Sequence, residues 1–259
     1  MAPPPPPRYD TIGRGYAAFR QPDPHIAAQI WAAVGDAARI LNVGAGTGSY
    51  EPPHRHLVAV EPSAVMVDQR GPASAPVVRA AAEALPFPDR SFDVALAMMT
   101  VHHWADLAAG LAELRRVADR QVIFTFDPDL HDALWVFHEY VTAALGFAAE
   151  APLSNVADAL GPCRVEVVPV PADCTDGFAS AYWRRPERYL SPSVRASISA
   201  FARLSDAQVE PGMTRLREDL ASGTWHRDHA HLLQMESLDA GLRLVVAGES
   251  PASSHGRRR

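Results

Sequence analysis

The chain has 259 residues, of which 47% are hydrophobic and 21% are charged, so it is long enough and apolar enough to bury a sizeable core. All 24 basic residues are Arg, and the absence of Lys excludes a Walker-type phosphate loop, a pyridoxal Schiff base and a lysine general base. The net charge of −6 provides no basic field, so we expect neither nucleic acid nor a membrane surface as a partner.

The cysteine count and the ends of the chain indicate the cellular compartment. Cys163 and Cys174 are too few for a disulfide framework or a cysteine metal site, and no metal is expected. The opening residues, MAPPPPPRYD, contain no apolar signal segment, and the apolar stretch at 133–149 is interrupted by His138 and Glu139. We therefore expect a cytoplasmic protein and leave monomer and homodimer both open.

The N-terminal region is predicted to be helical outside a solvated arm. Residues 1–8 form a Pro-rich arm that we expect to be disordered. Apolar residues spaced by three and four predict a helix over 9–19, and a second helix follows over 26–34. Both helices fall in a region that we delimit as 9–36.

An α/β core is predicted over residues 37–176. Strands that alternate with helices such as 107–117 indicate a mostly parallel sheet with helices on both faces, which is a three-layer sandwich. The strands are predicted from short apolar runs at 40–43, 57–60, 77–78, 94–98 and 122–126.

The pattern changes after Pro128. We predict a helix over 132–147, a strand over 164–170, and a mostly helical insertion over 177–235 that is too long for a hairpin. A last strand at 242–247 completes the core within residues 236–249, and the tail at 250–259 is expected to be disordered.

The most informative segment is a glycine-rich turn that follows the first predicted strand. Gly44, Gly46 and Gly48 let a ligand lie against the backbone, where N–H groups are free to bind it, so a nucleotide-like ligand is expected. The dinucleotide fingerprint needs glycine at its sixth position, where Ser49 stands, and this disfavours NAD and FAD. The structural alternative is an ordinary strand-to-helix turn.

Glu61 ends the second predicted strand, 17 residues after Gly44. In this topology an acid at that strand end reaches the crevice above the glycine turn. A carboxylate there can accept hydrogen bonds from both hydroxyls of a ribose. Together, the glycine turn and Glu61 favour a nucleoside-binding site over an ordinary strand-to-helix turn.

With these motifs the chain resembles the class I S-adenosylmethionine-dependent methyltransferases, and specifically their methyltransferase type 11 group. The glycine motif at 41–48, the acidic motif at 60–63, the segment AEALPFPDRSFD at 82–93 and the VHHW segment at 101–104 all match the family pattern. The sequence departs from that pattern at Asn42, where the family often has Asp. It also departs at Ala81, where an acid often binds the adenine amino group.

The resemblance implies a Rossmann-like fold with a mostly parallel seven-stranded sheet and a helical insertion before the last strand. It implies S-adenosyl-L-methionine as cofactor, S-adenosyl-L-homocysteine as product, and a lid formed by the N-terminal helical region. The cofactor-binding residues that it implies are Gly44, Ala45, Gly46 and Gly48, the ribose acid Glu61, the adenine-slot residues Pro62, Ser63, Met66, Ala82 and Glu83, the Met98 carbonyl, and Tyr16 and Arg20 of the lid.

A base that removes a proton from the acceptor is expected at the carboxyl edge of the sheet, where the sulfonium of the cofactor would point. His102 and His103 follow the fourth predicted strand. Because adjacent residues cannot share one helix face, we expect at most one of them to enter the pocket, and we favour His103 as the base. The alternative is that one histidine caps a helix and the other is packed. For Arg20, the alternative to a cofactor clamp is a surface side chain that faces Asp23.

The insertion is expected to act as a substrate-binding cap for a small-molecule acceptor of the secondary-metabolite type. The alternative for its aromatic residues is that they pack the core of the insertion. Two other functions stay open: a tRNA or protein methyltransferase, and a non-catalytic S-adenosylmethionine-binding protein. The acceptor-binding candidates are Trp104, His131, Tyr182 and Trp183.

Overall fold

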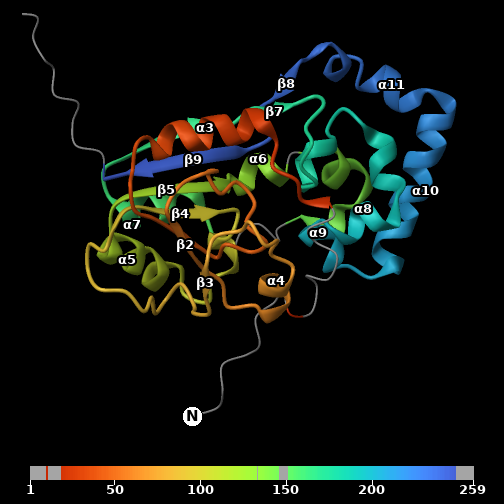
Figure 1. Cartoon of the computed structure of the whole chain (residues 1–259). Helices are drawn as coiled ribbons and strands as arrows, with labels where there is room; N and C mark the ends of the chain where they lie inside the picture. The colour runs from red at the N-terminus through yellow and green to blue at the C-terminus, as the bar shows by residue number, and fades with distance from the viewer. Residues whose placement is uncertain (1–9, 11–18, 133, 146–150, 249–259) are drawn as a thin grey trace, which may run out of the picture.

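The computed structural model describes Asp10 and residues 19–132, 134–145 and 151–248. Its main element is a seven-stranded sheet with the strand order β3-β2-β1-β4-β5-β9-β6 (Figure 1). The first five strands of this order pair in parallel, and β9 is antiparallel to both of its neighbours. The predicted Rossmann-like, mostly parallel sheet is confirmed. Its strands are β1 (Ile40–Val43), β2 (Leu57–Val60), β3 (Val77–Val78), β4 (Phe92–Met98), β5 (Ala118–Phe126), β6 (Cys163–Val167) and β9 (Leu242–Ala247).

Side chains that alternate along the strands build a hydrophobic core on each face of the sheet. In β4, Val94 and Leu96 join the cluster beneath α3 (Pro24–Val34), whereas Ala95 and Ala97 join the cluster of the opposite face. That second cluster includes α5 (Leu107–Val117) and α7 (Leu153–Leu160). Figure 1 shows α3 and α5 on opposite sides of the sheet. Burial on both faces explains why the strands read as continuous apolar runs in the sequence.

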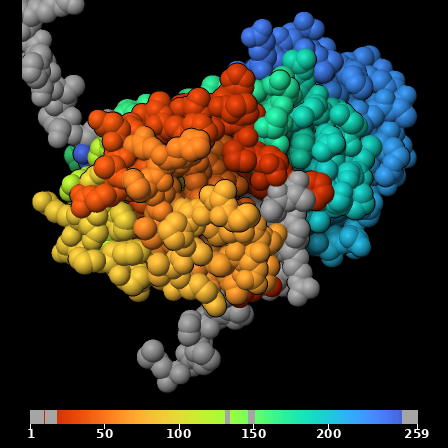
Figure 2. Space-filling view, in the orientation of Figure 1, coloured from red at the N-terminus to blue at the C-terminus, as the bar shows by residue number. Residues whose placement is uncertain are grey.

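The insertion forms a helical lobe beside the sheet, coloured teal to blue in Figure 2. Two short strands, β7 (Val170–Pro171) and β8 (Ser237–Leu238), pair with each other and bracket it. The buried residues of the lobe belong to the same hydrophobic cluster as the α3 face of the sheet, so the lobe and the sheet share one core. Its helices are α8 (Pro192–Ala196), α9 (Ser199–Ala202), α10 (Asp206–Ser222) and α11 (Thr224–Asp228), with 3-10 turns at Ala179–Tyr182, Pro186–Leu190 and Leu232–Gln234.

The single helix predicted over 132–147 is wrong. The described residues instead form α6 (Pro128–Asp132), a π-helical turn at Val136–Tyr140 and a 3-10 turn at Thr142–Ala144. Tertiary packing accounts for the change, because α10 crosses this segment so closely that a Cβ at Gly212 would lie 2.0 Å from the Tyr140 carbonyl oxygen.

The strand predicted over 164–170 also differs, because it divides between β6 of the main sheet and β7 of the small one. The helix α7, which no pattern had indicated, covers the α5 face of the sheet. Apart from Asp10 and Phe19, the helix predicted over 9–19 lies outside the described residues, and so do both ends of the chain.

Candidate functional site

The glycine turn after β1 adopts a left-handed backbone that strongly favours glycine. Gly44, Gly46 and Gly48 have φ values of 67°, 53° and 96°. The Gly44 N–H donates to the Val60 carbonyl at 2.8 Å, which anchors the turn to the end of β2. A Cβ at Gly44 would lie 2.1 Å from Thr100 Oγ1, so the Thr100 side chain fills the space under the turn.

The Glu61 carboxylate lies beside this turn and is only 5% exposed. Its Oε2 accepts the Gly46 N–H at 2.8 Å, and its Oε1 accepts the Ser63 N–H at 2.9 Å. Burial raises the pKa of Glu61, and these two N–H groups together with the Arg70 guanidinium oppose that rise. Each carboxylate oxygen keeps a lone pair beyond these bonds, so the group can accept two further donors.

The segment after Glu61 forms the short helix α4 (Ala64–Asp68), whose first turn packs against the glycine turn. The Ser63 hydroxyl caps α4 by accepting the Met66 N–H at 3.2 Å and donates to Asp10 Oδ1 at 2.6 Å. That hydroxyl lowers the pKa of Asp10. Met66 is buried, and its Cε would lie 3.2 Å from a Cβ at Gly46. Met66 thus forms an apolar wall beside the turn, next to the half-buried Pro62 and the capping hydroxyl of Ser63.

The loop that carries the AEALPFPDRSFD segment is held by carboxylates. Ala82 is buried in the core, and the Glu83 carboxylate accepts the N–H groups of residues 105–106 at 2.8 and 3.1 Å. Glu113 of α5 accepts the Leu85 N–H at 2.7 Å. The Glu83 side chain therefore joins this loop to the segment after β4. The predicted adenine contact through the main chain of Ala82 and Glu83 stays a prediction.

His102 and His103 lie on a 3-10 turn, Val101–His103, directly after β4. Their ring centroids are 3.9 Å apart, and the His102 ring lies 4.9 Å from the Phe126 ring at the end of β5. The helix-face argument does not apply to these residues, because this turn is too short to present two helix faces. The expectation that at most one of them enters the pocket stays a prediction. Both rings lie together at the carboxyl edge of the sheet, in the segment that follows the end of β4 at Met98. The assignment of the base to His103 stays a prediction.

Trp104 packs against α5. A Cβ at Gly110 would lie 2.4 Å from the Trp104 ring, so the glycine makes room for the indole. The Trp104 side chain also joins the hydrophobic cluster of the α5 face. These contacts account for Trp104 by packing, and its contact with an acceptor stays a prediction.

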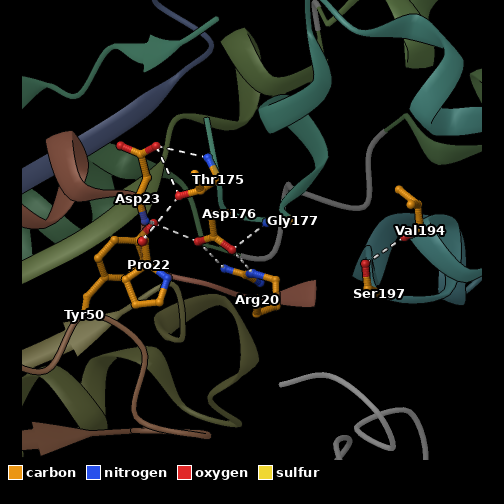
Figure 3. A network of polar contacts seen from close by, with 9 residues as sticks. All are labelled: Arg20, Pro22, Asp23, Tyr50, Thr175, Asp176, Gly177, Val194 and Ser197. Atoms are coloured by element: carbon orange, nitrogen blue, oxygen red, sulfur yellow. Dashed lines mark hydrogen bonds and ion pairs between the residues drawn. The ribbon is translucent and has the colours of Figure 1, made fainter. Parts of the chain in front are cut away.

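Arg20 forms a buried ion pair with Asp176. The alternative of a surface side chain that faces Asp23 is therefore wrong, and the role of Arg20 as a cofactor clamp stays a prediction. The Arg20 Nε lies 2.6 Å from Asp176 Oδ1, with the two side chains 9% and 0% exposed (Figure 3). The Tyr50 hydroxyl donates to Asp176 Oδ2 at 2.7 Å, and burial beside this carboxylate raises the pKa of Tyr50. Asp23 instead caps α3 and accepts the Thr175 N–H at 3.1 Å. The network thus joins Arg20 of the N-terminal segment, Tyr50 just after the glycine turn, and Asp176 at the start of the lobe.

The aromatic residues of the lobe lie in its core. The Trp183 indole is 0% exposed and donates to the Val170 carbonyl at 3.1 Å, while Tyr182 is covered by the Arg185 guanidinium at 5.3 Å. These surroundings match the packing alternative, and acceptor contact by Tyr182 and Trp183 stays a prediction. His131 lies in α6 with a side chain outside the described set, and Tyr16 lies outside the described residues.

The fold also forms a polar cluster beside the glycine turn from residues whose contacts with one another no sequence pattern marks. Asn42, Glu51 and Arg70 meet beneath the glycine turn through hydrogen bonds and an ion pair. Like the Arg20, Tyr50 and Asp176 network, they come from separate segments of the chain, so only the folded chain brings their side chains together. Within the described part of the chain, no cluster of three or more His, Cys, Asp or Glu is arranged for a metal. Among the described helices, none has the length and apolar character to cross a membrane.

Comparison with known proteins places this geometry in a family. The family model for the methyltransferase domain (Methyltransf_11) matches residues 41–126. A solved structure from Anabaena variabilis ATCC 29413, described as a methyltransferase from an antibiotic biosynthesis pathway, is 31% identical, with coverage of 88% of this chain and 98% of that chain and a TM-score of 0.81. The uncharacterized methyltransferase YcgJ of Bacillus subtilis (strain 168) is 30% identical over 90 residues, which are 30% of this chain and 36% of that protein. The chain therefore belongs to the S-adenosylmethionine-dependent methyltransferases of the type 11 group.

Proposed function

We propose that this protein transfers a methyl group from S-adenosyl-L-methionine to a small-molecule acceptor. The observation that carries the proposal is the Glu61 carboxylate, which is buried against the glycine turn with one N–H bond on each oxygen. A buried carboxylate is costly unless it is hydrogen-bonded, so its remaining lone pairs suit a ligand that brings two hydroxyl donors. The ribose of the cofactor is such a ligand.

The residues present fit this cofactor on two observations. A Cβ at Gly46 would approach Met66 to 3.2 Å, so the missing side chain keeps open the space between the turn and the apolar wall. The second observation is Asn42 Oδ1, which is buried and has no hydrogen-bond partner among the described residues, and so can accept a donor from a ligand or a water. Open backbone, a diol acceptor and an apolar wall together match a nucleoside.

When bound, S-adenosylmethionine supplies an electrophilic methyl group on its sulfonium. The chain's part is to orient the reactants: Glu61 binds the ribose hydroxyls, and the glycine turn presents its backbone. His103, or His102 beside it, accepts the proton of the acceptor at a ring nitrogen, because both rings lie at the carboxyl edge of β4. Orientation and one base are sufficient for this transfer, so we propose no metal.

A small-molecule acceptor is supported by charge and by architecture. The net charge of −6 is unfavourable for tRNA. The helical lobe lies beside the sheet and shares one continuous core with the α3 face of its strands. The Anabaena relative, described as belonging to an antibiotic biosynthesis pathway, is consistent with an acceptor of the secondary-metabolite type. The lobe is the part of the chain that we propose to select the acceptor.

The experiment combines ligand binding with turnover. We expect S-adenosylmethionine and S-adenosylhomocysteine to raise the melting temperature, by mass action on the folded state, and NAD to have no effect. Release of S-adenosylhomocysteine is then measured with a panel of phenolic, amine and activated-carbon acceptors and with bulk tRNA. Stabilisation by NAD would refute the cofactor assignment. Binding without turnover on any acceptor would favour the non-catalytic alternative, and turnover on tRNA alone would refute the small-molecule acceptor.

A further inference from the structure

A buried ion pair lies directly beneath the glycine turn. Arg70 Nη2 contacts both oxygens of Glu51, at 2.7 and 3.0 Å, and the Arg70 side chain is only 4% exposed. Asn42 of β1, fully buried, donates from Nδ2 to Glu51 Oε1 at 3.2 Å. A Cβ at Gly48 would lie 3.2 Å from the Glu51 carboxylate and 3.3 Å from the Arg70 guanidinium, so the pair packs against the turn itself.

Arg70 also fixes the backbone of the turn. Its Nη1 donates to the Gly46 carbonyl at 3.1 Å, and its Nη2 donates to the Ala75 carbonyl at 3.2 Å. The N–H of the same Gly46 donates to Glu61. Gly46 is therefore held on one side by the proposed ribose acid and on the other by a guanidinium that Glu51 orients.

The net charge of the cluster formed by Asn42, Glu51 and Arg70 depends on the residue at position 42. The Asn42 amide must point its nitrogen at Glu51, because the flipped amide would place an oxygen against a carboxylate. A carboxylate at position 42 would stand beside the Glu51 carboxylate in a buried site, where two negative charges cannot both be kept without a second cation. Glu51 thus supplies the carboxylate that the family pattern often places at position 42.

We propose that Glu51 and Arg70 are positioning residues that hold the glycine turn in its cofactor-binding form, and that this arrangement requires a neutral residue at position 42. The inference rests on the proposed function, because the turn is taken to bind S-adenosylmethionine. An ion pair with a purely structural role would affect folding but would leave the affinity of the folded protein unchanged.

The test is a double-mutant cycle on the whole chain with Asn42→Asp, Glu51→Gln and the two combined. Calorimetry measures the dissociation constant of S-adenosylhomocysteine, and thermal melts measure folding. We expect Asn42→Asp to weaken binding by about tenfold or more and Glu51→Gln by about fivefold. The combined variant is expected to return to within about threefold of the parent, because the amide and the carboxylate have exchanged places and the total charge is restored.

Two further variants separate positioning from folding. Arg70→Lys keeps the charge but cannot bond Glu51, Gly46 and Ala75 at once, so it is expected to weaken binding by about fivefold in a folded protein. Asp93→Asn is the matched control. Asp93 likewise accepts two backbone N–H groups and an Arg, but at the amino end of β4, so this variant is expected to lower the melting temperature and leave the affinity unchanged.

The outcomes divide as follows. A combined variant that binds no better than Asn42→Asp, or an Asn42→Asp variant with parental affinity, would overturn the inference. If Asn42→Asp does not fold, Arg70→Lys decides, because unchanged binding in that folded variant overturns the inference and weakened binding supports it. Absence of S-adenosylhomocysteine binding to the parent protein would refute the proposed function instead.

Discussion

Replacement of Glu61 by Gln tests the proposed cofactor site with the smallest change of shape. In the parent, one oxygen accepts the Gly46 N–H and the other accepts the Ser63 N–H. The glutamine side chain of the variant would keep one acceptor oxygen, and its NH₂ group would face one of these N–H donors. The variant therefore loses the charge and one of the two acceptors for the ribose hydroxyls. One hydrogen bond to a charged group contributes about 1.5–3 kcal/mol, which corresponds to a loss of affinity of roughly 10- to 150-fold.

The assay is calorimetric titration with S-adenosylhomocysteine and with its 2′-deoxy analogue. If Glu61 binds the ribose hydroxyls, loss of a hydroxyl weakens binding to the parent but changes binding to Glu61→Gln much less. Additive effects of the two changes, or an unchanged dissociation constant in Glu61→Gln, would refute the reasoning. Asp93→Asn serves again as the control with an unchanged binding site.

Because the pKa of Glu61 is raised, the stability of the parent and that of the Glu61→Gln variant are expected to depend differently on pH. Because burial raises the folded-state pKa above the unfolded value, the folded protein binds more protons, and the stabilising contribution of Glu61 is complete only below the unfolded pKa of about 4.3. That contribution falls as the pH rises through the folded pKa. We expect the free energy of unfolding of the parent, relative to Glu61→Gln, to decrease from about pH 4 upward in urea titrations, whereas a constant difference would contradict the burial argument.

Three other substitutions test separate parts of the structure. Trp183→Ala is expected to cost about 3–5 kcal/mol in urea unfolding, because the indole is fully buried, and a folded variant with parental stability and a raised acceptor KM would instead support acceptor binding. Gly44→Ala is expected to abolish S-adenosylhomocysteine binding in calorimetry, since the new Cβ would meet Thr100 Oγ1 at 2.1 Å, and parental affinity would show that the turn can move. His103→Gln is expected to lower kcat on the order of 10²-fold with an unchanged cofactor dissociation constant, and an unchanged kcat would exclude this ring as the base.

The central strands of the core could be predicted because each is a local apolar run that is buried on both faces. The bounds of β1, β2, β3 and β9 agree with the sequence prediction, and so do those of α5. The segment 132–147 could not be predicted in this way, because its apolar residues lie on all sides and its shape is set by α10, which follows about 60 residues later in the chain.

Some residues of the candidate site could likewise be predicted from local sequence, whereas others come together only in the folded chain. The glycine turn and Glu61 have local signals, since each follows the end of a strand, and the structure brings the two together. The partners of Arg20 could not be read from the sequence, because Asp176 lies 156 residues away and reaches it only through the fold. The histidine pair was identified, but its geometry depends on a 3-10 turn that periodicity does not distinguish from a helix.

The Asp176 carboxylate has a consequence for building chimeric enzymes from this family. It accepts hydrogen bonds from Arg20, from Tyr50 and from the N–H of Gly177, so segments from three parts of the chain share one buried negative charge. A graft that exchanges the lobe for that of a relative must therefore join after Gly177, or must carry matching residues for Arg20 and Tyr50. A junction that removes Asp176 breaks a buried ion pair at a cost of about 3–5 kcal/mol, a large part of the stability of a typical domain.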